Sequence, residues 1–155
     1  MTDLSDEQYH VLLVFRCALR RYLRWSADEA GRLGLTANQH QALLAVRGHQ
    51  GPNPPSIREL AGYLMIRHHS AVELVRRMET LGVLTRSSDP HDHRVVRLAL
   101  TEHGEELLSR LATTHMAELQ RVVARLGITE DLLSRLSTEF VSHLDLDVHY
   151  PESSG

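Results

Sequence analysis

The sequence predicts a mainly α-helical protein with a small β-hairpin, and two local patterns lead to this assignment. The first is the spacing of a helix start, in which a serine or threonine is followed three residues later by glutamate or glutamine. It occurs at Ser5 with Gln8, Thr36 with Gln39 and Ser56 with Glu59. The second is the alternation of apolar Val96, Leu98 and Leu100 with other residues, which is typical of a half-buried strand.

Residues 56–104 contain helices and strands in an order that indicates a particular fold. We expect a short helix, a turn and a second helix that ends at Gly82, because glycine adopts the left-handed backbone that closes a helix. Two short β segments should follow, joined by a charged loop that begins with the turn former Asp89-Pro90. Helix, turn, helix and β-wing in this order define a winged helix-turn-helix, whose second helix can enter the major groove of DNA.

The second helix of this unit combines an inward apolar stripe with polar faces. The stripe consists of Ala71, Leu74, Val75 and Met78. The N-terminal turn of such a helix approaches base edges, and here it carries Arg67, His68, His69 and Ser70. Arginine makes the commonest specific contact to guanine, whereas His69 can equally pack against the preceding helix. Three further arginines are candidates for phosphate contacts, namely Arg58, Arg76 and Arg77.

Arg94 stands at the tip of the predicted wing. Its guanidinium can enter a narrow minor groove, where the negative potential of DNA is greatest. Asp92, two residues earlier, can hold this arginine through a charge-assisted hydrogen bond. The alternative is an ordinary exposed ion pair, which contributes less than about 1 kcal/mol. The position in the wing favours a role in DNA binding.

The wing residues Asp89-Pro90-His91-Asp92-His93-Arg94 are followed by Val96, Leu98, Leu100, Thr101 and Gly104. This segment resembles the wing of the MarR family of bacterial transcriptional regulators, in which aspartates and an arginine precede an alternating strand and an L-T-x-x-G segment. The order of expected elements is similar to that family from about residue 5 to about residue 144. The chain departs from the common family pattern at His68-His69, where proline or a small polar residue often opens the recognition helix.

The resemblance implies a homodimer on a near-palindromic operator, and it implies a division of the single MarR-like chain 1–155. Residues 36–100 would form the DNA-binding lobe, residues 5–31 and 101–144 the dimerisation helices, and residues 145–155 a flexible tail. Long helices with an uncovered apolar stripe require a partner. The interface candidates, which could instead pack within one subunit, are Leu12, Phe15, Leu19, Leu132, Leu136, Phe140 and Leu144.

The same resemblance implies a cleft between the dimerisation helices and the DNA-binding lobe for a small aromatic or anionic effector. Polar and aromatic side chains near that junction are the candidates, although each could also belong to the edge of the core or to a solvated face: Arg21, Arg24, Trp25 and His40. The effector would bind the dimer spacing that does not match the operator, and would thereby release DNA from a regulator acting as a repressor.

The charge distribution fits a DNA-binding lobe joined to an acidic segment. The net charge is -3, but residues 56–100 hold seven arginines against five acids, whereas residues 101–155 hold four arginines against ten acids. Such a distribution steers DNA toward one face. Because the local excess is small, we expect affinity to depend on a dimer.

Composition excludes several other classes of protein. The single cysteine, Cys17, cannot form an intrachain disulfide, which favours a reducing cytoplasm. No apolar run approaches the roughly 18 residues of a membrane span, and the acidic N-terminus lacks an export signal. The sequence has no paired catalytic carboxylates, nucleophile elbow or phosphate loop, so we expect neither an enzyme nor a cofactor.

Two alternative functions remain. A metal- or redox-responsive regulator could use His91 and His93 of the wing, or Cys17. The wing lacks the spacing of a zinc site, so we expect no metal, and for Cys17 a buried structural role is favoured. A winged helix can also dock protein without binding DNA, since a fold alone does not fix function.

Overall fold

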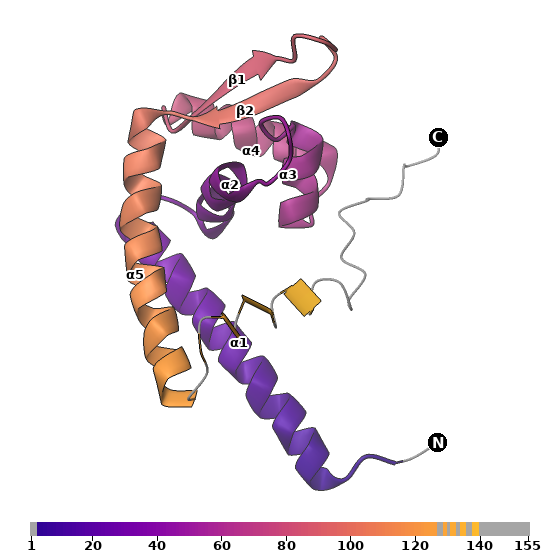
Figure 1. The fold of residues 1–155 in the computed structure, drawn as a ribbon, viewed down its shortest axis with the longest axis vertical. Helices are drawn as coiled ribbons and strands as arrows, with labels where there is room; N and C mark the ends of the chain where they lie inside the picture. Colours follow the sequence, from indigo (N-terminus) through magenta and orange to yellow (C-terminus); the bar gives the residue numbers. More distant parts are fainter. Residues whose placement is uncertain (1–2, 127–128, 130, 133, 136–137, 140–155) are drawn as a thin grey trace. The chain divides into compact units, whose positions relative to one another are not determined.

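The computed structural model describes residues 3–126, 129, 131–132, 134–135 and 138–139 of the chain. Through residue 126 the order of elements is α1 (Asp6–Arg32), α2 (Ala37–Gly48), α3 (Ile57–Leu64), α4 (His68–Thr80), β1 (Leu84–Ser88), β2 (Val96–Leu100) and α5 (Glu102–Leu126) (Figure 1). This is the mainly helical, winged arrangement that the sequence predicts. The chain divides into two compact units, Met1–Ala37 and Asn38–Gly155.

Helix α1 dominates the first unit and begins with the predicted capping box. The Ser5 hydroxyl accepts a hydrogen bond from the backbone N–H of Gln8 (3.3 Å), and the Gln8 side chain accepts one from the backbone N–H of Ser5 (2.8 Å). Asp6 and Glu7 lie in the first turn, where a negative charge interacts favourably with the helix dipole and stabilises the helix. The structure therefore confirms the helix start that the Ser5–Gln8 spacing predicts.

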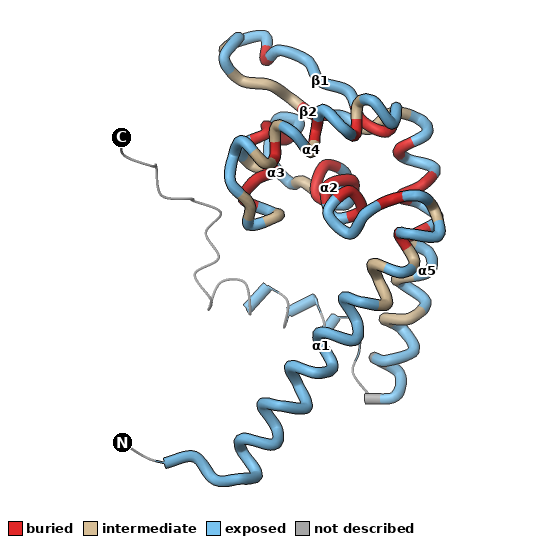
Figure 2. Tube along the Cα trace, turned by 180° about the vertical axis from the view of Figure 1, so that it is seen from behind, coloured by how far each residue is buried: buried red, intermediate tan, exposed pale blue. Residues whose placement is uncertain are grey.

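The apolar side chains of α1 are exposed along most of its length (Figure 2). Five consecutive residues are between 50 and 60% exposed, namely Val11, Leu12, Leu13, Val14 and Phe15, and Leu19 is 48% exposed. Five consecutive positions occupy every side of a helix with 3.6 residues per turn. The apolar surface therefore encircles this stretch of α1, which is a broader surface than the stripe of Leu12, Phe15 and Leu19 that the sequence predicts.

The remaining interface candidates belong to the C-terminal part of the chain. Leu132 is described and is 41% exposed. Leu136, Phe140 and Leu144 lie outside the described residues, and so does the expected tail at 145–155.

The core of the second unit lies between α2, α3, α4 and the β1–β2 hairpin (Figures 1 and 2). Its largest fully buried side chains are Leu43, Leu60, Val75, Met78, Val83, Leu84 and Leu98. In α4, Ala71, Val75 and Met78 are completely buried and Leu74 is half-buried, which confirms the predicted stripe. The polar faces of α4 are consequently turned away from the core.

The turn between α3 and α4 contains a left-handed backbone conformation that the sequence does not predict. Met65 ends α3 with φ 52° and ψ 43°, and its side chain is 73% exposed. Left-handed backbone costs a residue with a Cβ roughly 1–2 kcal/mol. At the end of α4, by contrast, Gly82 has the positive φ of 70° that its residue type predicts.

The wing is an antiparallel hairpin that is joined to the segment before α3. Leu84 pairs with Leu100 and Ser88 with Val96. On the other edge of β2, the backbone N–H of Leu98 donates to the Pro55 carbonyl oxygen (2.9 Å). An isolated bridge between Ser56 and Arg97 extends this contact. Strand β2 is therefore paired on both of its edges, with β1 on one side and with Pro55 and Ser56 on the other.

Thr101 links the wing to α5, as the sequence predicts. Its hydroxyl accepts a hydrogen bond from the Gly104 backbone N–H (3.0 Å) and donates one to the Gly82 carbonyl oxygen (2.6 Å). This arrangement brings Gly104 so close to the preceding turn that a Cβ there would lie 2.0 Å from the Val83 carbonyl oxygen.

Among the described residues, no helix is both long and apolar enough to span a membrane.

The close approach at Gly104 makes a direct prediction about stability. Gly104→Ala should reduce the free energy of unfolding by about 1–3 kcal/mol, because the backbone must move to make room for the methyl group. Thermal unfolding followed by circular dichroism measures the change. Gly48→Ala is the matched control, since a Cβ at Gly48 meets nothing within 4 Å. Equal melting temperatures for Gly104→Ala and wild type would contradict the contact.

Candidate nucleic-acid interface

The N-terminal turn of α4 presents the predicted base-contacting residues to solvent. The helix begins at His68, with Arg67 as its N-cap residue and no capping hydrogen bond from the Arg67 side chain. Arg67, His68 and His69 are exposed, and Ser70 is half-buried. The exposure of His69 rules against packing on the preceding helix, which was the alternative for this residue. Three adjacent side chains can therefore face a ligand at this helix end.

The arginines predicted to contact phosphate are also exposed. Arg76 donates to the Glu73 carboxylate at 3.1 Å, and both side chains are more than half exposed. Arg77 on the same helix and Arg58 near the start of α3 are exposed as well. Because solvent-exposed ion pairs are weak, the pairing with Glu73 leaves Arg76 able to exchange its partner for a phosphate.

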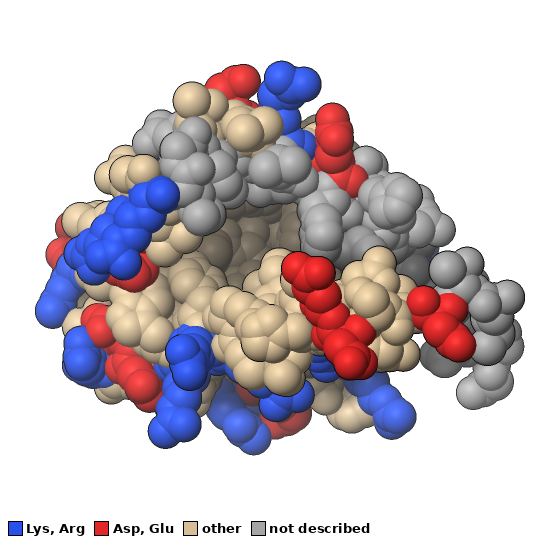
Figure 3. Space-filling view, turned by 90° about the horizontal axis from the view of Figure 1, so that it is seen from below, with Lys and Arg blue, Asp and Glu red and all other residues tan. Residues whose placement is uncertain are grey.

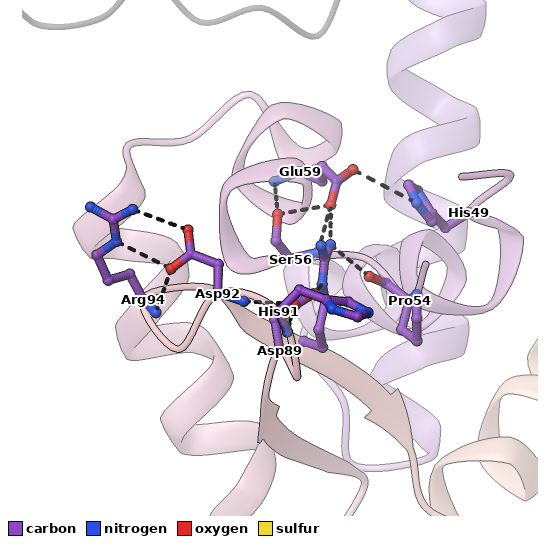
Figure 4. A network of polar contacts seen from close by, with 9 residues as sticks. His49, Pro54, Ser56, Glu59, Asp89, His91, Asp92 and Arg94 are labelled. Carbon is purple, nitrogen blue, oxygen red and sulfur yellow. Dashed lines mark hydrogen bonds and ion pairs between the residues drawn. The ribbon is translucent and has the colours of Figure 1, made fainter. Parts of the chain in front are cut away.

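At the wing tip, Asp92 holds Arg94 as the sequence predicts (Figure 4). The Arg94 side chain donates from Nε to Asp92 Oδ1 (3.1 Å) and from NH2 to Asp92 Oδ2 (3.4 Å), and its backbone N–H also donates to Oδ1 (3.0 Å). These hydrogen bonds lower the pKa of Asp92. The arginine is nevertheless 91% exposed, so its guanidinium is held in place and still accessible.

The start of the wing loop contains an interaction that the sequence analysis missed. Asp89 is buried and accepts hydrogen bonds from Arg97 Nε (2.7 Å) and from the backbone N–H groups of His91 (2.8 Å) and Asp92 (3.0 Å). The Arg97 hydrogen bond, followed by the two backbone donors, lowers the pKa of Asp89 from 3.8 to about 2. The carboxylate therefore stays ionised and fixes the first turn of the wing loop.

A second acidic group, Glu59, meets the same arginine from α3. Its Oε2 accepts hydrogen bonds from the backbone N–H (2.7 Å) and the hydroxyl (2.8 Å) of Ser56, which confirms the predicted capping box, and lies 3.5 Å from Arg97 NH1. His49 Nε2 lies 3.8 Å from Glu59 Oε1. Burial acts to raise the pKa of Glu59, but the Ser56 hydrogen bonds and the charges of His49 and Arg97 outweigh it and lower the pKa.

The candidate metal ligands of the wing are not gathered into a site. His91 and His93 are exposed, and Asp89 is engaged by Arg97. Within the described part of the chain, no group of three or more histidine, cysteine, aspartate or glutamate side chains is arranged to hold a metal ion.

Cys17 lies on α1 and is exposed, so the expected burial of this residue is wrong. The sequence analysis relied on the usual burial of free cysteine. The apolar residues that precede Cys17 on α1 are themselves exposed, so this part of the helix offers no core to cover the thiol.

The four effector candidates fall into both units. Arg21 and Arg24 are exposed on α1, and Trp25 is half-buried with its ring 5.8 Å from that of Tyr22. His40 is buried on α2, with its ring centroid 4.7 Å from that of His115 on α5. Burial, and to a lesser extent the charge of His115, lowers the pKa of His40.

Comparison with known proteins agrees with this geometry. A family model described as MarR family matches residues 33–95. The HTH-type transcriptional regulator PecS of Dickeya dadantii is 29% identical over 110 residues, which cover 71% of this chain and 60% of PecS. This chain thus spans about three fifths of the length of that relative.

Two solved structures show the same fold at low sequence identity. AbsC, a MarR family transcriptional regulator from Streptomyces coelicolor, has a TM-score of 0.74 at 23% identity and covers 94% of this chain and 99% of its own. A mutant of MarR from E. coli, complexed with operator DNA, has a TM-score of 0.65 at 20% identity, covering 92% and 99%.

The helix-turn-helix, the flanking hairpin and the long α5 helix define a winged-helix fold, which AbsC and the E. coli MarR mutant share. Within this fold, residues 33–95 are similar to the MarR family.

The lowered pKa of Asp89 predicts how its contribution to stability depends on pH. A carboxyl group whose folded pKa is about 2 and whose ordinary value is 3.8 stabilises the native state above its ordinary pKa, and this contribution is lost as pH falls through the folded value. Asp89→Asn should therefore unfold at a lower temperature than wild type at pH 7. The difference should shrink as pH falls from about 4 to about 2. A gap that stays constant over that range would show that the carboxylate charge is not responsible.

Proposed function

We propose that this protein is a sequence-specific, double-stranded DNA-binding transcriptional regulator that acts as a homodimer on a near-palindromic operator. In this proposal it represses its targets until a small-molecule effector releases it. The match of residues 33–95 to the MarR family model and the fold shared with a MarR solved on operator DNA support DNA binding. The observation that carries the proposal is Arg94, which is 91% exposed and yet held by two side-chain hydrogen bonds to Asp92.

The restraint on Arg94 matters because an unrestrained arginine loses side-chain entropy when it binds. Asp92 reduces that loss by limiting the guanidinium before DNA arrives. An exposed ion pair contributes little to stability, so recognition explains this arrangement better than folding does. We infer that Arg94 enters the minor groove while Arg67, His68 and His69 face the adjacent major groove.

The surface charges support binding that is modest for one copy of the chain. Figure 3, which is seen from below and does not show the wing side, has arginine and acidic side chains interspersed. On α4 and β1, Arg76 and Arg86 each have an acidic partner. Each copy would therefore neutralise few phosphates. Two copies on one operator would double the number of phosphate and groove contacts, which is one reason to propose a dimer.

The exposed apolar surface of α1 is the second reason to propose a homodimer. A helix that is apolar on all sides needs to be buried, and α1 is apolar and exposed on every side from Val11 to Phe15. A second copy related by a two-fold axis would cover both helices at once and would place two α4 helices about one DNA turn apart. We propose that residues 5–31 and 101–144 supply this interface and that residues 36–100 bind DNA.

Effector release would follow from a shift between two dimer spacings. An effector that binds the spacing unsuited to the operator lowers the population that binds DNA, whereas one that binds both equally changes nothing. Arg21, Arg24, Trp25 and His40 remain our candidates for effector contacts.

Substitution of the wing arginine tests the proposed function. Arg94→Ala should weaken operator binding at least about tenfold, because it removes the minor-groove contact, and should leave the melting temperature unchanged. Fluorescence anisotropy with DNA from the region upstream of the gene measures the affinity. Arg32→Ala removes an exposed arginine that lies outside the ranges proposed to bind DNA or to form the dimer. It is the control and should bind like wild type. Unchanged affinity for Arg94→Ala would refute the role of the wing.

The salt dependence of the same titrations distinguishes DNA binding from a protein-docking module. Binding to DNA should weaken steeply as salt releases the phosphate contacts. An absence of binding to any duplex from the genomic neighbourhood at low salt would reject DNA recognition altogether.

The dimer is tested at the centre of the exposed apolar stretch. Phe15→Glu should convert a dimer to monomers, because it places a charge in a surface that the partner would bury. Sedimentation velocity measures the mass in solution. Phe15→Leu keeps the surface apolar and should remain dimeric. A wild-type protein that sediments as a monomer at micromolar concentration would contradict the proposed assembly.

A further inference from the structure

We propose that Arg97 is a positioning residue for DNA recognition: it fixes the wing relative to α3 and thereby determines where the Arg94 guanidinium lies. The proposal rests on the proposed function, because it assigns to Arg97 an effect on DNA binding that is transmitted through Arg94.

The guanidinium of Arg97 joins the wing loop to the start of α3 and to the segment just before α3, which are far from the wing loop in the sequence. It donates from Nε to Asp89 Oδ2 in the wing loop (2.7 Å) and from NH1 to the Pro54 carbonyl oxygen before α3 (3.1 Å). NH1 also lies 3.5 Å from Glu59 Oε2 in the first turn of α3. The Arg97 side chain is only 19% exposed and that of Asp89 only 8%, so this contact is shielded from solvent.

The partners of Arg97 are themselves fixed on the α3 side. Glu59 is held by the backbone N–H and hydroxyl of Ser56, so one carboxylate serves both the helix start and the wing (Figure 4). His49 lies beside Glu59, and its Nδ1 is 2.8 Å from the Tyr63 hydroxyl on α3. Arg97 therefore connects the wing to a rigid part of the helix-turn-helix.

From Asp89 the connection continues to the wing tip. One oxygen of Asp89 binds Arg97, and the other accepts the backbone N–H groups of His91 and Asp92. Asp92 in turn holds the side chain of Arg94 through both of its carboxylate oxygens. A continuous series of polar contacts therefore runs from Glu59 on α3, through its ion pair with Arg97, and then by hydrogen bonds through Asp89 and Asp92 to Arg94. Figure 4 labels Glu59, Asp89, Asp92 and Arg94 of this series.

The hairpin needs such a connection because it has only two strands. Two-stranded hairpins are marginally stable in water by themselves, and the backbone contacts of β2 with Pro55 and Ser56 are made at Leu98 and Arg97, within the strand and not in the wing loop. Loss of Arg97 would leave those backbone contacts in place and release the loop that carries Asp92. The expected consequence is a folded protein whose Arg94 is poorly placed.

A double-mutant cycle between Arg97 and Arg94 tests the proposal. Arg97→Met keeps the bulk of the side chain and removes its hydrogen bonds. It should weaken operator binding about tenfold in the wild-type background and less than about twofold in the Arg94→Ala background, because coupled residues are non-additive. A purely structural role for Arg97 would change affinity equally in both backgrounds. The melting temperature should fall in either case, because loss of Arg97 leaves the buried Asp89 carboxylate without its partner.

Two further variants keep the test decisive. Glu59→Gln preserves the capping-box acceptor and removes the charge that faces Arg97, so it should show the same dependence on Arg94 with a smaller loss. Arg47→Met removes a different ion pair of the second unit, at 3.4 Å from Glu105, and should be additive with Arg94→Ala. Should Arg97→Met fail to fold, Arg97→Lys and Glu59→Gln carry the cycle.

The outcomes separate this inference from the proposed function. Equal effects of Arg97→Met in both backgrounds, with Arg94→Ala still weakening binding, would overturn the positioning role alone. A wild-type protein that binds no operator, or an Arg94→Ala variant that binds as tightly as wild type, would overturn both.

Discussion

The guanidinium of Arg97 lies where the wing loop, the segment before α3 and the first turn of α3 meet. Its hydrogen bond to Asp89 is short, at 2.7 Å, and both side chains are largely shielded from water. Charge-assisted hydrogen bonds of this kind are stronger than neutral ones, and removing one partner leaves the other charge buried and unpaired. In our proposal, the position of the wing loop relative to the helix-turn-helix depends on this contact.

The surrounding structure explains why one contact matters so much. The wing meets the rest of the second unit through the backbone contacts of β2 with Pro55 and Ser56, through the Arg97 side chain, and through the turn into α5, where Gly104 approaches the Val83 carbonyl oxygen. The α4 helix is fixed independently, by burial of Ala71, Val75 and Met78. A protein that uses α4 and the wing together on DNA must keep a constant distance between two elements with separate supports, and Arg97 provides that link.

The net negative charge of the chain makes the position of its individual arginines more important. With a net charge of -3, general attraction to phosphate is weak, so affinity has to come from well-placed groups and from a second copy. The Arg94 side chain, which is accessible and yet held, suits the first requirement. The exposed apolar surface around α1 suits the second.

Local signals in the sequence were sufficient for the elements and for the wing tip. Capping boxes, the α4 stripe and the Asp92–Arg94 pair involve residues at most a few positions apart, so their spacing reveals them. Arg97 was missed because its partner Pro54 is 43 residues away.

Other features were missed because they depend on the chain fold rather than on spacing. The contact of His40 with His115 joins α2 and α5, two helices that are far apart in the sequence. The left-handed backbone conformation at Met65 was missed because this residue is not a glycine, the residue type that usually marks such a conformation. Cys17 is exposed because the described residues of the first unit do not cover this part of the α1 surface.

The most direct measurement is a footprint of the protein on DNA that flanks its own gene, with guanine methylation reporting on the major groove and hydroxyl radicals on the minor groove. Two major-groove sites about one helical turn apart are expected, each beside a minor-groove protection that Arg94→Ala abolishes while the major-groove protection persists. A single unpaired site, or a minor-groove protection that survives loss of the arginine, would contradict recognition by a wing and helix held together.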